Sequence, residues 1–193
     1  MKTQIFYSFL LLSFFFAFCK FESTDSQKFG NFFTSEETKE LNKILNYFDE
    51  KVKNISSSGE IKECYEEFCQ SILQDFKSGY ITFDTIGLSN VYSQTFSKNI
   101  WLINTGTQRD SIGQLTNKLF CELNLKGKYL EFLKYNSKKN DFIKNYFEKL
   151  IQVGGIGPSS NTLMLRCDEI DFSNENVRLI FAIHWITYSC TYF

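Results

Sequence analysis

Apolar residues recur at steps of three and four along the first half of the chain, and this period indicates amphipathic helices. The first stripe follows the segment 34–37 (TSEE), which has the pattern of a helix-capping box. Its members are Leu41, Ile44, Leu45, Phe48, Val52 and Ile55. A second stripe follows the polar segment 57–60, where the capping signal is repeated. Its members are Ile61, Tyr65, Phe68, Ile72 and Phe76. Two helices with so short a connection predict an antiparallel helical hairpin.

The second half of the chain carries further helical periods. Residues 142–151 form its most regular apolar run, and the glycines at 154–155 provide a helix end, with Pro158 suited to the start of the next helix. Residues 177–190 are apolar on nearly every side. We expect a helix there rather than a central strand, because the solid apolar run exceeds the usual strand length of about 5–6 residues.

The middle of the chain suits both helix and strand. Apolar residues between 88 and 103 keep a helical spacing, Leu115, Leu119 and Leu123 suggest another helix, and residues 129–133 suggest a short one. We therefore expect an all-α fold, an irregular bundle of about six to eight helices in one globular domain over residues 33–193. The alternative is an α+β fold with a few short strands, near residues 80–84, 100–104 and 178–187.

The N-terminus has the pattern of an export signal. Lys2 precedes the apolar run Ile5–Phe18, which only two serines interrupt. As a helix this run would span about 21 Å, at about 1.5 Å per residue, whereas the hydrocarbon core of a bilayer is about 30 Å thick. Residues 1–18 therefore predict a cleaved secretory signal. A buried N-terminal helix is the alternative, although a polar stretch follows this fully apolar run at once.

A cysteine stands at the end of the apolar run, in the segment 16–19 (FAFC). This segment resembles a bacterial lipobox, with Phe18 where that pattern has a small residue. Residues 19–32 are polar and predict a flexible tether. With a composition rich in Phe, Ile, Asn, Lys and Tyr, the N-terminus resembles those of small envelope lipoproteins of Bacteroidota or spirochaetes. The resemblance implies that Cys19 is acylated and that the membrane is a partner. Cleavage after Cys19 with ordinary secretion, or an uncleaved anchor, are the alternatives.

Five cysteines follow the predicted signal: Cys64, Cys69, Cys121, Cys167 and Cys190. An odd number cannot pair completely, so two disulfides and one free thiol are the most that an oxidising compartment can form. Cys64 and Cys69 point about 140° apart on a helix, so we do not expect them to bridge each other. The spacing gives no support to a zinc site or thioredoxin-like chemistry. The connectivity stays open, and the alternative is that most of the five are small buried core residues.

Composition offers little material for catalysis or nucleic-acid binding. The chain has 21 basic and 22 acidic residues, a net charge of −1, which leaves no basic excess for phosphates. We expect the one histidine, His184, to be a buried core residue. The catalytic alternative places it with Cys167 and Asp168 or Glu169. The second predicted helix carries five carboxylates: Glu60, Glu63, Glu66, Glu67 and Asp75. We expect them to lie on a solvated helix face, and the alternative is a cation site or a pair of carboxylates for hydrolysis.

These observations favour an exported, lipid-anchored envelope protein with a binding or structural role, no catalysis, no cofactor and no nucleic-acid partner. Two alternatives come from other functional classes. The first is a secreted or periplasmic inhibitor or immunity-type protein that blocks one partner. The second is a small hydrolase that uses a cysteine or His184.

Overall fold

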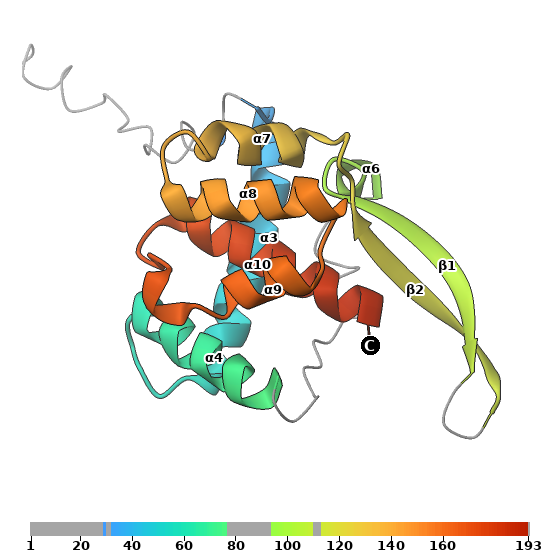
Figure 1. The fold of residues 1–193 in the computed structure, drawn as a ribbon, viewed down its shortest axis with the longest axis horizontal. Helices are drawn as coiled ribbons and strands as arrows, with labels where there is room; N and C mark the ends of the chain where they lie inside the picture. The colour runs from blue at the N-terminus through green and yellow to red at the C-terminus, as the bar shows by residue number, and fades with distance from the viewer. Residues whose placement is uncertain (1–28, 30–31, 77–93, 110–112, 193) are drawn as a thin grey trace, which may run out of the picture.

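The computed structural model describes residue 29 and residues 32–76, 94–109 and 113–192. Within these ranges the protein is mostly helical, with seven α-helices, one 3-10 turn and one two-stranded sheet, which confirms the mostly helical fold (Figure 1). No helix in the described part of the chain is both long and apolar enough to cross a bilayer. The predicted signal, tether and Cys19 lie outside the described residues, as does the possible strand at 80–84.

The first two expected helices are α3 (Ser35–Ile55) and α4 (Ile61–Phe76), which pack against each other. The predicted capping box is confirmed, since Glu37 N donates to Thr34 Oγ1 at 3.2 Å and Thr34 N donates to Glu37 Oε2 at 2.8 Å. The predicted stripe of α3 is buried except for Ile55, whose surface is 63% exposed at the helix end. The stripe therefore identifies the face that α3 turns to the core.

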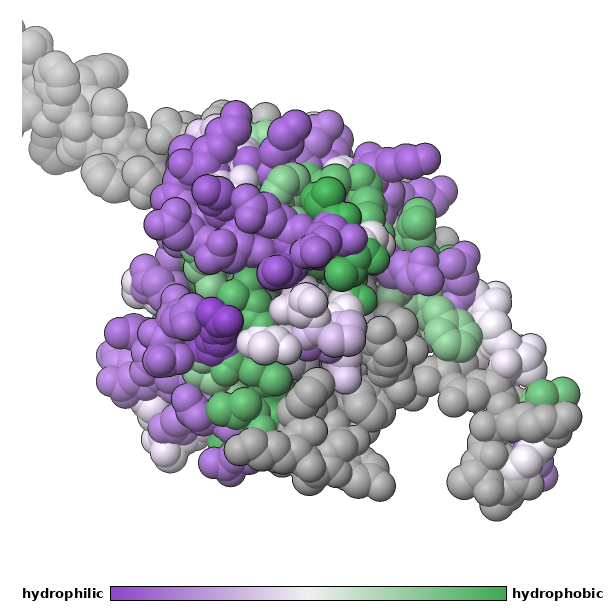
Figure 2. Space-filling model, in the orientation of Figure 1, coloured by the Kyte–Doolittle hydropathy of each residue, from purple (hydrophilic) through white to green (hydrophobic). Residues whose placement is uncertain are grey.

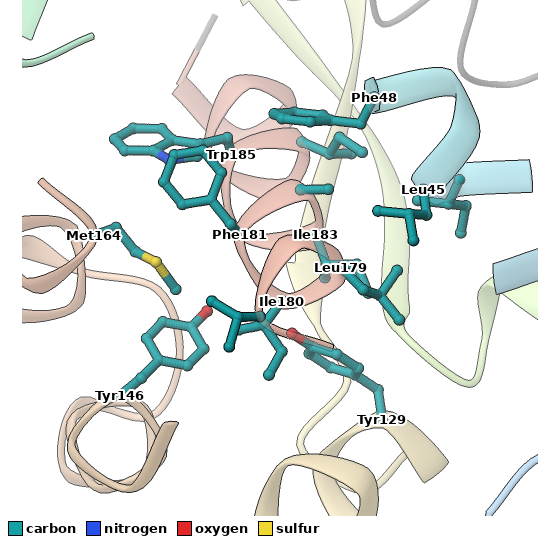
Figure 3. Packing of buried hydrophobic residues seen from close by; sticks show 14 of the residues in the cluster. Leu45, Phe48, Tyr129, Tyr146, Met164, Leu179, Ile180, Phe181, Ile183 and Trp185 are labelled. Atoms are coloured by element: carbon teal, nitrogen blue, oxygen red, sulfur yellow. The ribbon is translucent and has the colours of Figure 1, made fainter. Parts of the chain in front are cut away.

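The last helix, α10 (Glu175–Tyr192), lies at the centre of the fold. Every residue from Leu179 to Trp185 has no exposed surface, because α3, β2 and neighbouring helices cover it on different sides. Figure 3 shows Phe48 of α3, Tyr129, Tyr146 and Met164 pointing toward this helix from separate elements. The helix expected at 177–190 is thus confirmed, and its apolar residues on all sides reflect burial on all sides.

Three shorter helices form one side of the fold: α7 (Lys128–Asn136), α8 (Asp141–Val153) and α9 (Pro158–Met164). Helix α8 begins at Asn140, whose side chain accepts from Ile143 N, and ends at Gly154 in the left-handed conformation with φ 76°. Pro158 is the first residue of α9. The predicted helix stop and restart at 154–158 is therefore confirmed. In Figure 1, α7 and α8 lie side by side above α10.

The helix predicted at 115–123 is wrong, and the helix predicted across 88–103 is correct only in part of its described residues, 94–103. There α6 (Gln94–Ser97) is helical, residues 98–100 form a turn, and the chain from Trp101 onward enters an antiparallel hairpin. Its strands are β1 (Trp101–Arg109) and β2 (Leu115–Leu123), paired from Trp101 opposite Leu123 to Arg109 opposite Leu115. The hairpin projects from the helical body (Figure 1). The strand alternative for 100–104 was correct, and the one for 178–187 was not.

Four of the five cysteines form two disulfides. Cys69 of α4 pairs with Cys167 of the 3-10 turn η2 (Cys167–Glu169), and Cys121 of β2 pairs with Cys190 of α10. Cys64 is free and buried. The structure thus reaches the expected maximum of two disulfides. The alternative that most of the five are small buried core residues is correct as to burial, since all five are buried, although four of them are also paired. Cys64 and Cys69 do not bridge each other, as their angular separation on a helix predicted.

Candidate functional site

The hairpin formed by β1 and β2, called the arm below, is fixed to the body at its root. Trp101 is 1% exposed, and its Nε1 donates to Thr187 Oγ1 of α10 at 2.7 Å. The Thr187 hydroxyl in turn donates to the carbonyl of Ile183 at 2.6 Å, one turn earlier in α10. The Cys121–Cys190 disulfide joins the second strand to the same helix. A covalent bond and a buried hydrogen bond therefore hold the two strands of the arm against α10.

Beyond the root, apolar side chains continue into solvent. Leu102 is 48% exposed, Ile103 is 37% exposed, and Leu115 is 65% exposed. Because successive side chains of a strand alternate in direction, Leu102 and Ile103 lie on opposite faces of the arm. Figure 2 shows hydrophobic residues along the arm, outside the helical body. Three of the six large apolar side chains that are exposed in the described part of the chain lie on this one projecting element, which makes the arm a candidate interaction surface.

Gly106 allows the ring of Phe120 to lie across the first strand. A Cβ atom built at position 106 would lie 2.6 Å from a carbon of that ring, closer than carbon atoms approach. Phe120 stands opposite Asn104 in the strand pairing, so its ring crosses diagonally to the glycine. Glycine in a strand often marks a place where another group approaches closely, and the ring of Phe120 is that group at Gly106.

A small hollow of about 230 Å³ lies beside the root of the arm. It is lined by β2 residues Cys121, Glu122 and Leu123, by the loop 154–156 and by Thr187. Gly154 and Gly155 have φ of 76° and 150°, and no atom lies within 4 Å of the Cβ position of either. The hollow therefore adjoins the root of the arm through residues 121–123 of β2, and the arm and this hollow together form the candidate binding region.

The expectation for His184 is confirmed. Its side chain is fully buried on α10, and Nδ1 lies 3.1 Å from the hydroxyl oxygen of Tyr146, within hydrogen-bond distance. The rings of Trp185 and Tyr146 contact it edge to face. Burial without a neighbouring acid lowers the pKa of His184 to about 3. The imidazole is therefore neutral at ordinary pH and serves as a core residue.

The residues of the catalytic alternative lie in different environments and are not brought together. Cys167 is bonded to Cys69, so its sulfur is not a thiolate nucleophile in this state. Asp168 and Glu169 line a shallow hollow of about 540 Å³ on the surface beside α4. Glu169 forms an exposed ion pair with Arg166 at 3.3 Å. These acids face solvent, whereas His184 lies in the core, so the structure does not bring together the residues that the alternative requires.

The carboxylates of α4 hold the turn that precedes it. Glu67 accepts hydrogen bonds from Ser56 Oγ at 2.7 Å and from Ser57 N at 3.0 Å. These bonds, that from the Ser56 hydroxyl first, lower the pKa of Glu67. Glu63 accepts a hydrogen bond from the hydroxyl of Ser58. Glu66 forms an exposed pair with Lys62 at 3.6 Å. No group of three or more potential metal ligands occurs among the described residues, so the cation alternative gains no support.

Sequence reasoning missed a polar cluster that joins three helices. Tyr65 of α4 donates to Asp49 Oδ1 of α3 at 2.6 Å, and Arg178 Nε of α10 lies 3.6 Å from the same oxygen. The Arg178 guanidinium also lies over the ring of Tyr65, 5.9 Å from its centroid. Burial raises the pKa of Asp49 above its ordinary value, against the opposing effects of Tyr65 and Arg178. Each partner comes from a different helix, so the cluster fixes how the helices meet.

The chain matches no family model, no curated protein and no solved structure. The arm, the hollow at its root and the two disulfides are therefore the observations from which a function can be argued.

Proposed function

We propose that this chain is an exported protein, anchored to the cell envelope by a lipid on Cys19, that binds a protein partner through its arm. The observation that carries the proposal is the pair of disulfides, Cys69–Cys167 and Cys121–Cys190. Bonds of this kind persist in oxidising compartments and are rare in the cytosol of mesophiles. They agree with the apolar N-terminal run, which has the length of a secretory signal.

A binding role is supported by where the reactive side chains lie. His184 is buried and neutral, and Cys167 is used in a disulfide. The carboxylates of Glu63 and Glu67 accept hydrogen bonds from serines of the preceding turn. The arm, in contrast, exposes apolar side chains on both of its faces and is fixed at its root by α10. A rigidly mounted apolar surface loses little conformational entropy when it binds a partner.

The arm also favours the inhibitor or immunity-type alternative over the hydrolase. A hairpin that projects from a disulfide-fixed body can occupy a cleft of another protein without reorganising first (Figure 1). In that case the residues 102–107 of β1 would carry the contact. The two functions share the same surface and differ in what the partner does when it is bound.

The anchor is tested by growing the source cells with an alkyne-labelled palmitate analogue. We expect the protein to carry the label, Cys19→Ala to lose it, and Cys64→Ala to keep it as a matched cysteine control. A label that persists in Cys19→Ala would contradict lipidation at this residue. A released protein that begins at Lys20 would indicate ordinary secretion.

The compartment is tested separately on the same cells. Free thiols are alkylated in intact cells, and the protein is then digested without reduction and analysed by mass spectrometry. We expect peptides joined through Cys69–Cys167 and Cys121–Cys190, with Cys64 as the one thiol to be alkylated after unfolding. Alkylation of all four paired residues in the native cell would contradict export to an oxidising compartment.

A further inference from the structure

The outer edge of β1 pairs with no other strand in the described part of the chain. Among the described residues the sheet has two strands, and β2 is the one held against α10 by its contacts and by the Cys121–Cys190 disulfide. Figure 1 shows β1 on the side of the arm away from the helices. In an antiparallel ladder, every second residue of a strand turns its N–H and C=O groups away from its partner strand. Strand β1 therefore presents a row of backbone groups to a further strand.

Most of this edge lacks the usual protection against pairing. Soluble proteins blunt free strand edges with charged residues, proline or bulges. Residues 101–108 of β1 contain no charged residue and no proline, Arg109 at the end of the strand carries its one charge, and the pairing with β2 continues without a bulge. The nine-residue strand is also longer than the typical strand of about 5–6 residues. The edge is suited to pairing with another extended chain.

One face of β1, formed by residues 103, 105 and 107, is self-complementary about the midpoint of the strand. Strand β1 runs from Trp101 to Arg109, so Thr105 is its central residue. Antiparallel pairing of two β1 strands about Thr105 places Ile103 of one copy opposite Thr107 of the other, and Thr105 opposite itself. All three residues are β-branched, exposed and on the same face, and such cross-strand pairs stabilise sheets. A net charge of −1 adds little repulsion between two copies.

We propose, on the basis of the function proposed above, that the partner of the arm is a second copy of this chain. The two β1 strands would form the centre of a four-stranded antiparallel sheet, with a two-fold axis through Thr105. Each arm points away from its own body, so antiparallel pairing leaves the two bodies at opposite ends of the shared sheet (Figure 1). The arrangement is closed, because the same edge is used once by each copy.

A charge swap at the axis tests this geometry. Two copies with different epitope tags are produced together in the source cells, the membranes are solubilised in mild detergent, and one tag is captured while the other is quantified. Thr105→Lys in both copies sets two ammonium groups opposite each other, and Thr105→Glu in both sets two carboxylates opposite each other. We expect each of these pairs to reduce capture at least tenfold. The mixed pair, Lys in one copy and Glu in the other, should return to within about twofold of the unmodified pair.

Folding and specificity are controlled in the same experiment. Thr105 is exposed, so its replacement should leave both disulfides intact, as checked by mass spectrometry without reduction. Thr162→Lys, at an exposed threonine of α9, should leave capture unchanged. Equal capture for the Lys–Lys and Lys–Glu pairs would overturn the two-fold axis at Thr105, and absence of the second copy from the unmodified pair would overturn self-association.

A photo-crosslinking residue at position 107 separates this inference from the proposed function. A crosslink to residue 103 of a second copy supports both. A crosslink to a different protein overturns self-association and leaves the arm as a binding element. The same photo-crosslinking residue is placed at the exposed position Lys139 as a control. If position 107 gives no crosslink and position 139 gives none either, both proposals are overturned.

Discussion

Trp101 donates the hydrogen of its indole nitrogen to the hydroxyl of Thr187, which lies 86 residues later in the chain and one turn from the neutral His184. Both groups are buried, and the bond joins the first residue of β1 to the central helix. The position of the arm therefore depends on the packing of the core, so that a change inside α10 can be transmitted to an exposed surface.

The first prediction concerns this bond. Thr187→Val keeps the shape of the side chain but removes the hydroxyl oxygen that accepts the indole N–H of Trp101. We expect the free energy of unfolding to fall by about 1–3 kcal/mol, the usual cost of removing one partner of a buried hydrogen bond. Urea denaturation measures the loss, with the exposed Thr162→Val as the matched control. An unchanged midpoint for Thr187→Val would show that the bond contributes nothing to stability.

The second prediction concerns the aromatic core. The helical stripes predict that Phe48, Phe68 and Phe147 are all buried. Phe48 and Phe68 are 0% and 8% exposed, but Phe147 is only partly buried, so the prediction is wrong for Phe147. Phe48→Ala should lower the free energy of unfolding by about 3–5 kcal/mol, because it removes ring contacts and leaves a cavity. Phe147→Ala should cost clearly less, and Lys43→Ala should cost under about 0.5 kcal/mol. Chemical denaturation of the three variants gives this order, and equal losses at Phe48 and Lys43 would contradict it.

The third prediction concerns pH. The pKa of His184 is lowered from 6.5 to about 3 in the folded protein, so the unfolded chain binds the proton first as pH falls. The contribution of His184 to stability is complete above about pH 6.5 and declines at about 1.4 kcal/mol per pH unit below it. Between pH 7 and 5 the unmodified protein should lose about 2 kcal/mol through this residue.

His184→Gln tests the pH effect, because an amide can replace a ring hydrogen bond but does not titrate. Its stability between pH 7 and 5 should be nearly constant, although lower than that of the unmodified protein at pH 7. Denaturation curves at several pH values measure both slopes. The same steep slope in His184→Gln would assign the pH dependence to other groups.

The fourth prediction concerns the disulfides. Replacing Cys69 and Cys167 together by alanine releases a closed loop with a sequence separation of 98 residues. The free energy of unfolding should fall by about 2–5 kcal/mol, since the unfolded chain regains the freedom that the bond removes. Cys64→Ala is the control that alters a buried cysteine without altering a disulfide. A similar loss in both variants would indicate that packing, not the crosslink, is responsible.

The helical part of the fold could be predicted because the spacing of its apolar residues fits a helix alone. Steps of three and four in α3 and α8 fit a helix and no strand. Leu115, Leu119 and Leu123 are four residues apart. Residues with this spacing share one face of a helix, and they also share one face of a strand, because the side chains of a strand alternate with a period of two. The spacing therefore could not identify β2. The threonines at 105 and 107, with Gly106 between them, were the available strand signal.

The disulfide pairs and the polar contacts could not be predicted from the sequence. The capping role of Glu37 depends on a local spacing of three residues, and the sequence showed it. The ion pair of Glu37 with Lys128 at 2.7 Å joins positions 91 residues apart, which only the folded chain brings together. The same holds for the two disulfides and for the cluster of Asp49, Tyr65 and Arg178. Local signals therefore determine helices and their ends, while long-range contacts determine the site.

The two disulfides interleave along the chain, because Cys121 lies between Cys69 and Cys167, and Cys190 lies beyond both. This order has a mechanical consequence. When the N-terminal end of α3 and the arm are pulled apart, tension can pass from Cys69 to Cys167, along the chain to Cys190 and across to Cys121. That covalent route includes less than half as many residues as the direct backbone between Cys69 and Cys121. Stretching is therefore limited by the crosslinks, and reduction would lengthen the extensible chain without cutting it.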